Sequence, residues 1–188
     1  MEIPGSLSER FPFLDALEED WEPVSRIAFF GWLSFYVVLI RNALLGGLLV
    51  QWSDLVFIPI HEGGHLLFRM FGQWIMVAGG TFLQLFIPFA LAVSFAFRRQ
   101  VLGTAFCAFF FFEQFLPIAT YMADARAQEL PLLTVGDSED VIHDWFYLFS
   151  HTGLLQHDTQ IGSTFRILGW LGMLATVGWF SYRSLRKV

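Results

Sequence analysis

Apolar residues dominate five long segments of the chain, and polar residues separate these segments from one another. A helix that crosses a membrane needs about 20 mostly apolar residues. The segments that fit this pattern are 27–50, 55–71, 74–97, 101–123 and 161–182. The third of them contains no charged residue, and the fourth contains only Glu113. The pattern predicts an all-α membrane protein, a polytopic bundle of about five transmembrane helices.

Two polar regions flank or interrupt these segments. Residues 1–23 are acidic and contain no continuous apolar run, so we expect no cleavable signal peptide. Residues 124–160 form a polar loop that encloses a shorter apolar piece, 145–155. This piece is too short to span a membrane and is expected to be interfacial or re-entrant. Without repeats or an appended soluble region, the sequence predicts one integral-membrane domain, 1–188.

The composition agrees with a lipid environment. Apolar residues make up 55% of the chain and charged residues 15%, against about 25% charged residues in soluble domains. The single cysteine, Cys107, excludes an internal disulfide framework. The net charge of −6 argues against a nucleic-acid partner, which would need a basic face. We therefore expect a multi-pass protein in the lipid bilayer, in a bacterial inner membrane.

Arginine clusters predict the orientation in the membrane. Arg98 and Arg99 follow the third apolar segment, and Arg183, Arg186 and Lys187 close the chain. With five spans, both clusters would lie on one side, which the positive-inside rule assigns to the cytoplasm. The acidic N-terminal segment would then lie on the opposite side.

The second apolar segment contains the sequence HEGGH at residues 61–65. On a helix, His61 and His65 lie one turn apart on the same face, so both imidazoles can bind one metal ion. In zinc hydrolases with this pattern, the glutamate is not a ligand but takes a proton from the water that the metal activates. A chance match would leave the histidines as polar contacts between helices, yet charged groups at membrane depth cost about 2.5–3.5 kcal/mol. We therefore expect one zinc ion per chain, with Glu62 as the catalytic base.

A catalytic zinc ion usually has three protein ligands, so one more is needed. The candidates are Asp124, Asp137, His143, Asp144, His151, His157 and Asp158. Asp124 is favoured because it ends an apolar segment, where an unpaired carboxylate would be costly. His143 is the second choice. Asp144 also fits the start of a helix, where a negative charge is favourable without a metal.

Three stretches of the chain resemble the site-2 protease family of intramembrane zinc metalloproteases. HEGGH at 61–65 is similar to the family's H-E-x-x-H. AGGTFLQ at 78–84 resembles its A-G-P-x-x-N element, with Gln84 in place of asparagine. EQFLPIATYMADAR at 113–126 resembles its N-x-x-P-x-x-x-L-D-G stretch, with Gln114 near the asparagine and Asp124 at the zinc-binding aspartate. The chain departs from the last pattern, since Ala125 and Arg126 follow the aspartate.

The resemblance implies hydrolysis of a peptide bond in a membrane-embedded protein or peptide substrate. By the same resemblance, Gly79, Gly80, Gln84 and Gln114 are candidate substrate-binding residues, and a short extended or re-entrant element near 77–82 could pair with an unwound substrate. A simpler interpretation stays open, in which the two glycines ease the packing of a transmembrane helix.

A non-hydrolytic membrane metalloprotein is the alternative function. A metal transporter would need ligands on several helices along a path through the membrane, whereas this chain has one dense cluster. A haem-binding bundle would not need Glu62 beside a histidine ligand.

Overall fold

The computed structural model describes residues 20–130 and 143–185, with residues 48–54 described in backbone only. The elements in chain order are α3 (Arg26–Leu44), α4 (Leu48–Phe68), η1 (Arg69–Phe71), α5 (Gln73–Phe97), α6 (Val101–Glu113), α7 (Phe115–Ala123), α8 (Asp144–Thr152), η2 (Leu155–His157) and α9 (Asp158–Leu185). Every element in this part of the chain is helical, which confirms the predicted all-α fold.

Four helical segments are long and apolar enough to cross a membrane: Arg26–Leu44, Gln73–Phe97, Val101–Ala123 and Leu155–Leu185. Large apolar side chains on them face outward, among them Ile27, Phe82, Phe89 and Ile167. Such a surface would be unfavourable in water, and it fits the hydrocarbon core of a bilayer. The protein is therefore an integral membrane protein. The fifth long helix, α4, contains the HEGGH sequence and is not among these four segments.

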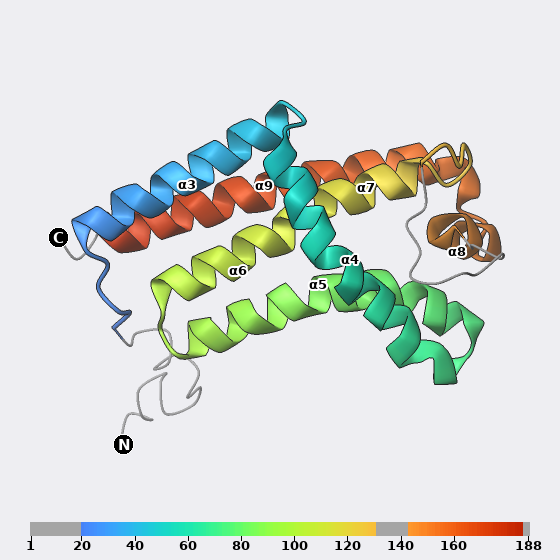
Figure 1. Ribbon diagram of the computed structural model, residues 1–188, viewed down its shortest axis with the longest axis horizontal. Coiled ribbons are helices and arrows are strands. Elements are labelled where there is room, and N and C mark those ends of the chain that lie inside the picture. The colour runs from blue at the N-terminus through green and yellow to red at the C-terminus, as the bar shows by residue number, and fades with distance from the viewer. Residues whose placement is uncertain (1–19, 131–142, 186–188) are drawn as a thin grey trace, which may run out of the picture.

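The long helices lie roughly alongside one another, except for α4 (Figure 1). α6 and α7 continue in one line with a break at Gln114, and α9 packs along both. α3 lies beside α9, and α5 lies beside α6. Aromatic side chains join three of these helices, since the ring of Tyr36 lies 5.0 Å from that of Phe109 and 5.6 Å from that of Phe180. α4 crosses the bundle obliquely and packs mainly along α5.

The predicted span 27–50 is wrong in its last six residues, because α3 ends at Leu44 and α4 begins at Leu48. Gly46 adopts a positive φ of 62°, a conformation that favours glycine, and Gly47 caps the start of α4. The chain therefore turns at this glycine pair, and α4 takes a new direction instead of returning alongside α3.

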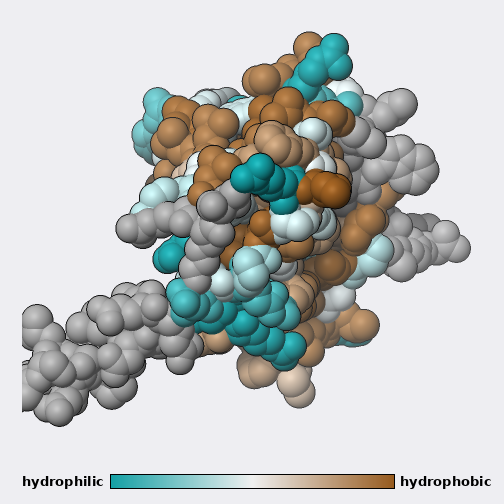
Figure 2. Space-filling view, turned by 90° about the vertical axis from the view of Figure 1, so that its left-hand side faces the viewer, coloured by the Kyte–Doolittle hydropathy of each residue, from teal (hydrophilic) through white to brown (hydrophobic). Residues whose placement is uncertain are grey.

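This turn also changes the predicted topology. Arg99 and Arg183 both lie over the ring of Trp21, at 5.6 Å and 5.4 Å from its centroid. The backbone N–H of Glu22 donates to the carbonyl of Arg99 at 2.9 Å. Arg99 and Arg183, which represent the two clusters in the described part of the chain, thus lie at one end of the bundle, as expected. The chain just before α3 lies at that same end, whereas the acidic N-terminal segment was expected on the opposite side. Residues 1–19 and 186–188 are outside the described part of the chain. Figure 2 looks onto this end, where hydrophilic patches lie between hydrophobic side chains.

The extended or re-entrant element expected near 77–82 is not present, since these residues belong to the continuous helix α5. Most of the shorter apolar piece, 145–155, belongs to the helix α8, and its interfacial or re-entrant position stays a prediction. α8 lies against α5 and α7 at the opposite end of the bundle from Trp21 (Figure 1). A small apolar cluster of Ile118, Met122 and Phe149 holds it there.

Candidate metal centre

The two histidines of the HEGGH sequence lie on the face of α4 that packs against α5. Their ring centroids are 4.7 Å apart, one helical turn along α4. Both side chains are half-buried. The predicted placement of His61 and His65 on one helix face is therefore confirmed.

Glycines allow α4 and α5 to approach closely enough to enclose the histidines. A Cβ atom on Gly64 would lie 2.8 Å from the Cα atom of Gly80, and one on Gly79 would lie 2.9 Å from the carbonyl oxygen of Gly64. Contacts this short do not occur between real Cβ atoms and backbone. Small residues at such interfaces let membrane helices pack backbone against backbone. The simpler interpretation of Gly79 and Gly80, close helix packing, is thus confirmed.

Gly80 has a second role, because it lies directly against the two imidazoles. A Cβ atom at this position would lie 2.6 Å from Nε2 of His65 and 2.7 Å from Nε2 of His61. Any side chain here would occupy the space between these two nitrogen atoms. The absence of a side chain at position 80 keeps that space open.

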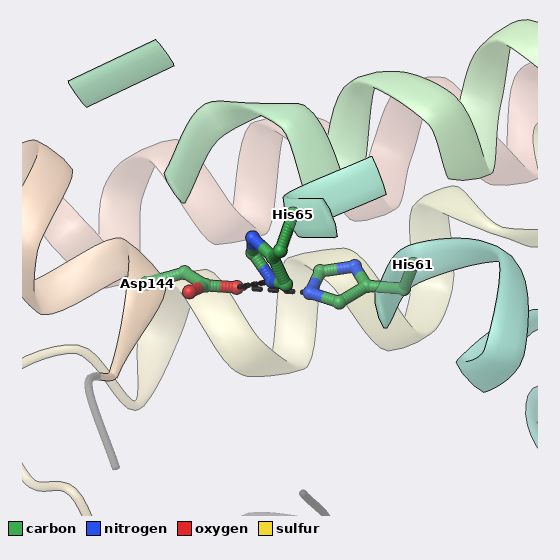
Figure 3. A group of neighbouring side chains, drawn as sticks. All are labelled: His61, His65 and Asp144. Carbon is green, nitrogen blue, oxygen red and sulfur yellow. Dashed lines mark hydrogen bonds and ion pairs between the residues drawn. The ribbon is translucent and has the colours of Figure 1, made fainter. Parts of the chain in front are cut away.

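The helix α8 brings a carboxylate to the same place. His143 caps its start by accepting a hydrogen bond from the backbone N–H of Phe146, and Asp144 is its first residue. The Oδ2 atom of Asp144 lies 2.9 Å from Nε2 of His61 and 3.3 Å from Nε2 of His65 (Figure 3). The three side chains form a group that could hold a metal ion, with their candidate ligand atoms within 4.8 Å of one another.

The hydrogen bonds behind the imidazoles show which ring nitrogens face the group. Nδ1 of His61 lies 2.9 Å from Oε1 of Gln84, and Nδ1 of His65 lies 2.9 Å from the carbonyl oxygen of Met76. A carbonyl oxygen only accepts hydrogen bonds, so each Nδ1 carries the proton. Each imidazole therefore turns Nε2 toward the carboxylate, where this atom can bind a metal ion through its lone pair or, when protonated, donate a hydrogen bond. Carbonyl partners fix the tautomer of metal-binding histidines in this way.

Two lone pairs and a carboxylate oxygen that face one another require a positive charge between them, either a proton or a metal ion. Asp144 is only 6% exposed. Burial by itself would raise the pKa of its carboxyl group, but where protons supply the positive charge, the hydrogen bonds and charge of the protonated His61 and His65 rings hold this pKa below its ordinary value. The group therefore favours an ionised carboxylate, and its donor set of two imidazoles and one carboxylate suits zinc.

Glu62 and Tyr121 flank the three candidate ligands. Glu62 follows His61 on α4 and is close enough to His65 and Tyr121 to interact with them electrostatically. The hydroxyl oxygen of Tyr121 accepts a hydrogen bond from the backbone N–H of Asp144 at 3.0 Å. Tyr121 is not among the residues predicted from the sequence, because its role depends on the position of α8.

Asp124, expected as the third ligand, is engaged elsewhere. Its carboxylate accepts hydrogen bonds from the backbone N–H groups of Glu129 and Leu130, at 2.9 Å and 3.1 Å, and lies 3.3 Å from Nε2 of His143. The structure thus brings Asp144, and neither Asp124 nor His143, to the two histidines. Of the other candidates, Asp158 pairs with Arg126, and Asp137 lies outside the described residues.

Gln84 and Gln114, expected near the substrate, lie within the bundle. Gln84 bonds to His61 as described, and its Nε2 donates to Oε1 of Gln114 at 2.6 Å. The structure therefore connects both glutamines to the metal centre. Their assignment to substrate binding, with that of Gly79 and Gly80, stays a prediction.

Comparison of the chain with protein-family models, with curated proteins and with solved structures finds no match. The resemblance to the site-2 protease family thus stays a prediction that depends on the short stretches given above.

Proposed function

We propose that the protein is a zinc-dependent peptidase that cleaves a peptide bond of a membrane-embedded substrate. This proposal is based on one observation, that His61, His65 and Asp144 lie close enough to bind one metal ion and that Glu62 follows His61 on α4. Two histidines and one carboxylate form a common ligand set of hydrolytic zinc sites, which keep one further position for water.

A bound zinc ion, Glu62 and Tyr121 would have different roles in the hydrolysis. A bound zinc ion would polarise a water molecule and a substrate carbonyl, and lower the pKa of the water to about 7. Glu62 takes the proton from the attacking water and passes it to the leaving amine. Tyr121 positions Asp144 by accepting the hydrogen bond from its backbone N–H.

The position of the group along α5 supports a substrate within the membrane. Gly80 lies seven residues after Gln73, the first residue of α5. At a rise of 1.5 Å per residue, the group lies about 10 Å along the helix from this end. Water can reach this depth from the end of the bundle, and a transmembrane helix can present its terminal turns there. The scissile peptide must first be unwound, because a helix engages its carbonyl groups in hydrogen bonds.

A transport function has less support. Among the residues that the structure describes, His61, His65 and Asp144 make up the one group that could hold a metal ion. A transported ion would need successive sites across the membrane.

The test compares Glu62→Gln with the wild type. A catalytic base is needed for turnover and not for metal binding, so Glu62→Gln should keep about one zinc ion per chain. It should lower cleavage by about two orders of magnitude or more. Metal content is measured by mass spectrometry of purified protein, and cleavage with a library of fluorogenic peptides of apolar transmembrane sequence in detergent micelles. Glu129→Gln, at an exposed position, is the matched control.

Two outcomes would contradict the proposal. If Glu62→Gln loses the zinc that the wild type holds, Glu62 is a ligand and cannot be the base. If the wild type binds no zinc, or if Glu62→Gln cleaves the peptides as fast as the wild type does, the protein is not a peptidase of this kind.

A further inference from the structure

A chain of buried polar side chains extends from the metal centre into the middle of the bundle. Gln84 lies on α5, and Gln114 and Glu113 lie at the break between α6 and α7. Their exposed fractions are 8%, 0% and 3%. Polar groups in the apolar interior of a membrane protein are costly, and a carboxylate is the most costly of them. The peptidase chemistry proposed above does not use Glu113.

The hydrogen bonds along this chain all run in one direction. The carboxylate of Glu113 accepts from Nε2 of Gln114 at 2.7 Å, so the Gln114 amide turns its oxygen toward Gln84. Gln84 then donates through Nε2 at 2.6 Å, and its own oxygen faces Nδ1 of His61. An ionised carboxylate accepts hydrogen bonds but cannot donate them, so Glu113 in its ionised form would hold both amides in this orientation. Nδ1 of His61 is left with one role, that of donor.

We propose that Glu113 is a positioning residue for His61, which acts through Gln114 and Gln84 to hold the imidazole with its proton on Nδ1 and its Nε2 lone pair toward the metal. Metal-binding histidines commonly donate their second N–H to a carboxylate, which orients the ring and makes it a stronger ligand. Here two amides separate the carboxylate from the ring. The part of this proposal that concerns the metal rests on the proposed zinc site, and the part that concerns the tautomer of His61 does not.

A purely structural role for these residues would be to join α5 to α6 and α7. Glu113→Gln separates the two roles, because glutamine has nearly the same shape and keeps a hydrogen bond to Gln114. An amide at position 113 both donates and accepts, so the direction of the whole chain becomes reversible. Gln84 could then turn its NH₂ group toward His61, and the lone pair of that ring would move to Nδ1.

The first measurement uses metal-free protein that carries Asp144→Ala, so that no carboxylate faces Nε2. The ¹⁵N chemical shifts of selectively labelled histidine report the tautomer of His61 near pH 8, with His61→Ala used to assign its signals. We expect the Nδ1–H form with Glu113 present and a mixture of both forms in Glu113→Gln. The same single tautomer in both proteins would overturn the proposal, whether or not the protein binds zinc.

The second measurement is the affinity for Co²⁺ in the chain with Asp144 intact, followed by its visible absorption. Loss of an indirect partner of this kind lowers metal affinity about 10- to 100-fold, and we expect this for Glu113→Gln. Adding Gln84→Glu to Glu113→Gln places a carboxylate directly against Nδ1 of His61, with Gln114 free to donate to it, and should restore the affinity. Thr176→Val, which removes a buried hydroxyl on α9, is the control and should leave the affinity unchanged.

The outcomes separate this proposal from the proposed function. If the wild type binds no Co²⁺, the metal centre fails, and the tautomer measurement alone decides the role of Glu113. If the wild type binds Co²⁺ and Glu113→Gln binds it equally well, the role of Glu113 is overturned and the metal centre stands. A loss of affinity that Gln84→Glu does not restore also overturns it, because the effect then comes from packing at position 113.

Discussion

The imidazole of His143 lies with its Nε2 atom 3.3 Å from Oδ2 of Asp124. His143 caps the start of α8, and the next residue is Asp144. Asp124 also binds the backbone N–H groups of Glu129 and Leu130. The carboxylate of Asp124 thus anchors the loop after α7 and the start of α8, and through them it holds Asp144 against the two histidines.

The first prediction distinguishes the two aspartates. Asp144→Ala removes a ligand and should lower zinc content to near zero. Asp124→Ala should keep the zinc at saturating metal concentration and weaken the affinity, because only the anchor of α8 is lost. Zinc content and affinity of both variants are measured after purification in detergent. Loss of zinc from Asp124→Ala with retention in Asp144→Ala would instead support Asp124 as the third ligand.

The sequence was sufficient to predict the helical membrane fold and the position of His61 and His65, because both follow from local patterns. Asp144 is among the candidate ligands, but the start of a helix by itself also explains an aspartate at this position. In the structure it is both the first residue of α8 and a candidate metal ligand. Which carboxylate reaches the histidines depends on how α8 packs against α5 and α7, and no local pattern contains that information. The turn at Gly46 and Gly47 did leave a signal in the sequence, since a glycine pair often ends a helix.

The second prediction concerns Gly80. In Gly80→Ala, the added methyl group would fall between the Nε2 atoms of His61 and His65. Overpacking of a well-packed site costs about 1–3 kcal/mol, so we expect metal affinity to fall about tenfold or more. Gly178→Ala is the matched control, because a Cβ atom at this position of α9 meets no atom within 4 Å. Equal metal affinity of the two variants would show that the metal does not lie between the histidines.

The third prediction is a pH dependence of stability that Asp124 causes. Burial alone would raise the pKa of its carboxyl group, but the backbone N–H groups of Glu129 and Leu130, together with His143, hold it below its ordinary value. The folded state therefore binds fewer protons than the unfolded state near pH 4. The stabilisation is complete above the unfolded pKa of about 4 and is lost as pH falls through the lower, folded pKa.

Asp124→Asn tests this dependence. The variant should melt at a lower temperature than the wild type at pH 7, and the difference should shrink as the pH falls below about 4. Melting temperatures are measured in detergent between pH 7 and pH 3, with the exposed Glu129→Gln as control. A difference that stays constant over this range would mean that the charge of Asp124 does not contribute to stability.

The last prediction concerns the topology in the membrane. Trp21 contacts both Arg99 and Arg183, so the chain before α3, the α5–α6 turn and the end of α9 lie at one end of the bundle. α8 lies at the other end (Figure 1). In a Cys107→Ala background, single cysteines at positions 20, 98 and 185 should react with a membrane-impermeant reagent from the same side of sealed vesicles. A cysteine at position 151, which is exposed on α8, should react from the opposite side.

The arginines assign the first side to the cytoplasm, because their translocation is disfavoured. Labelling of position 20 from the side of position 151 would mean that α3 and α4 cross the membrane as two separate spans, and that the oblique course of α4 is not its arrangement in the bilayer.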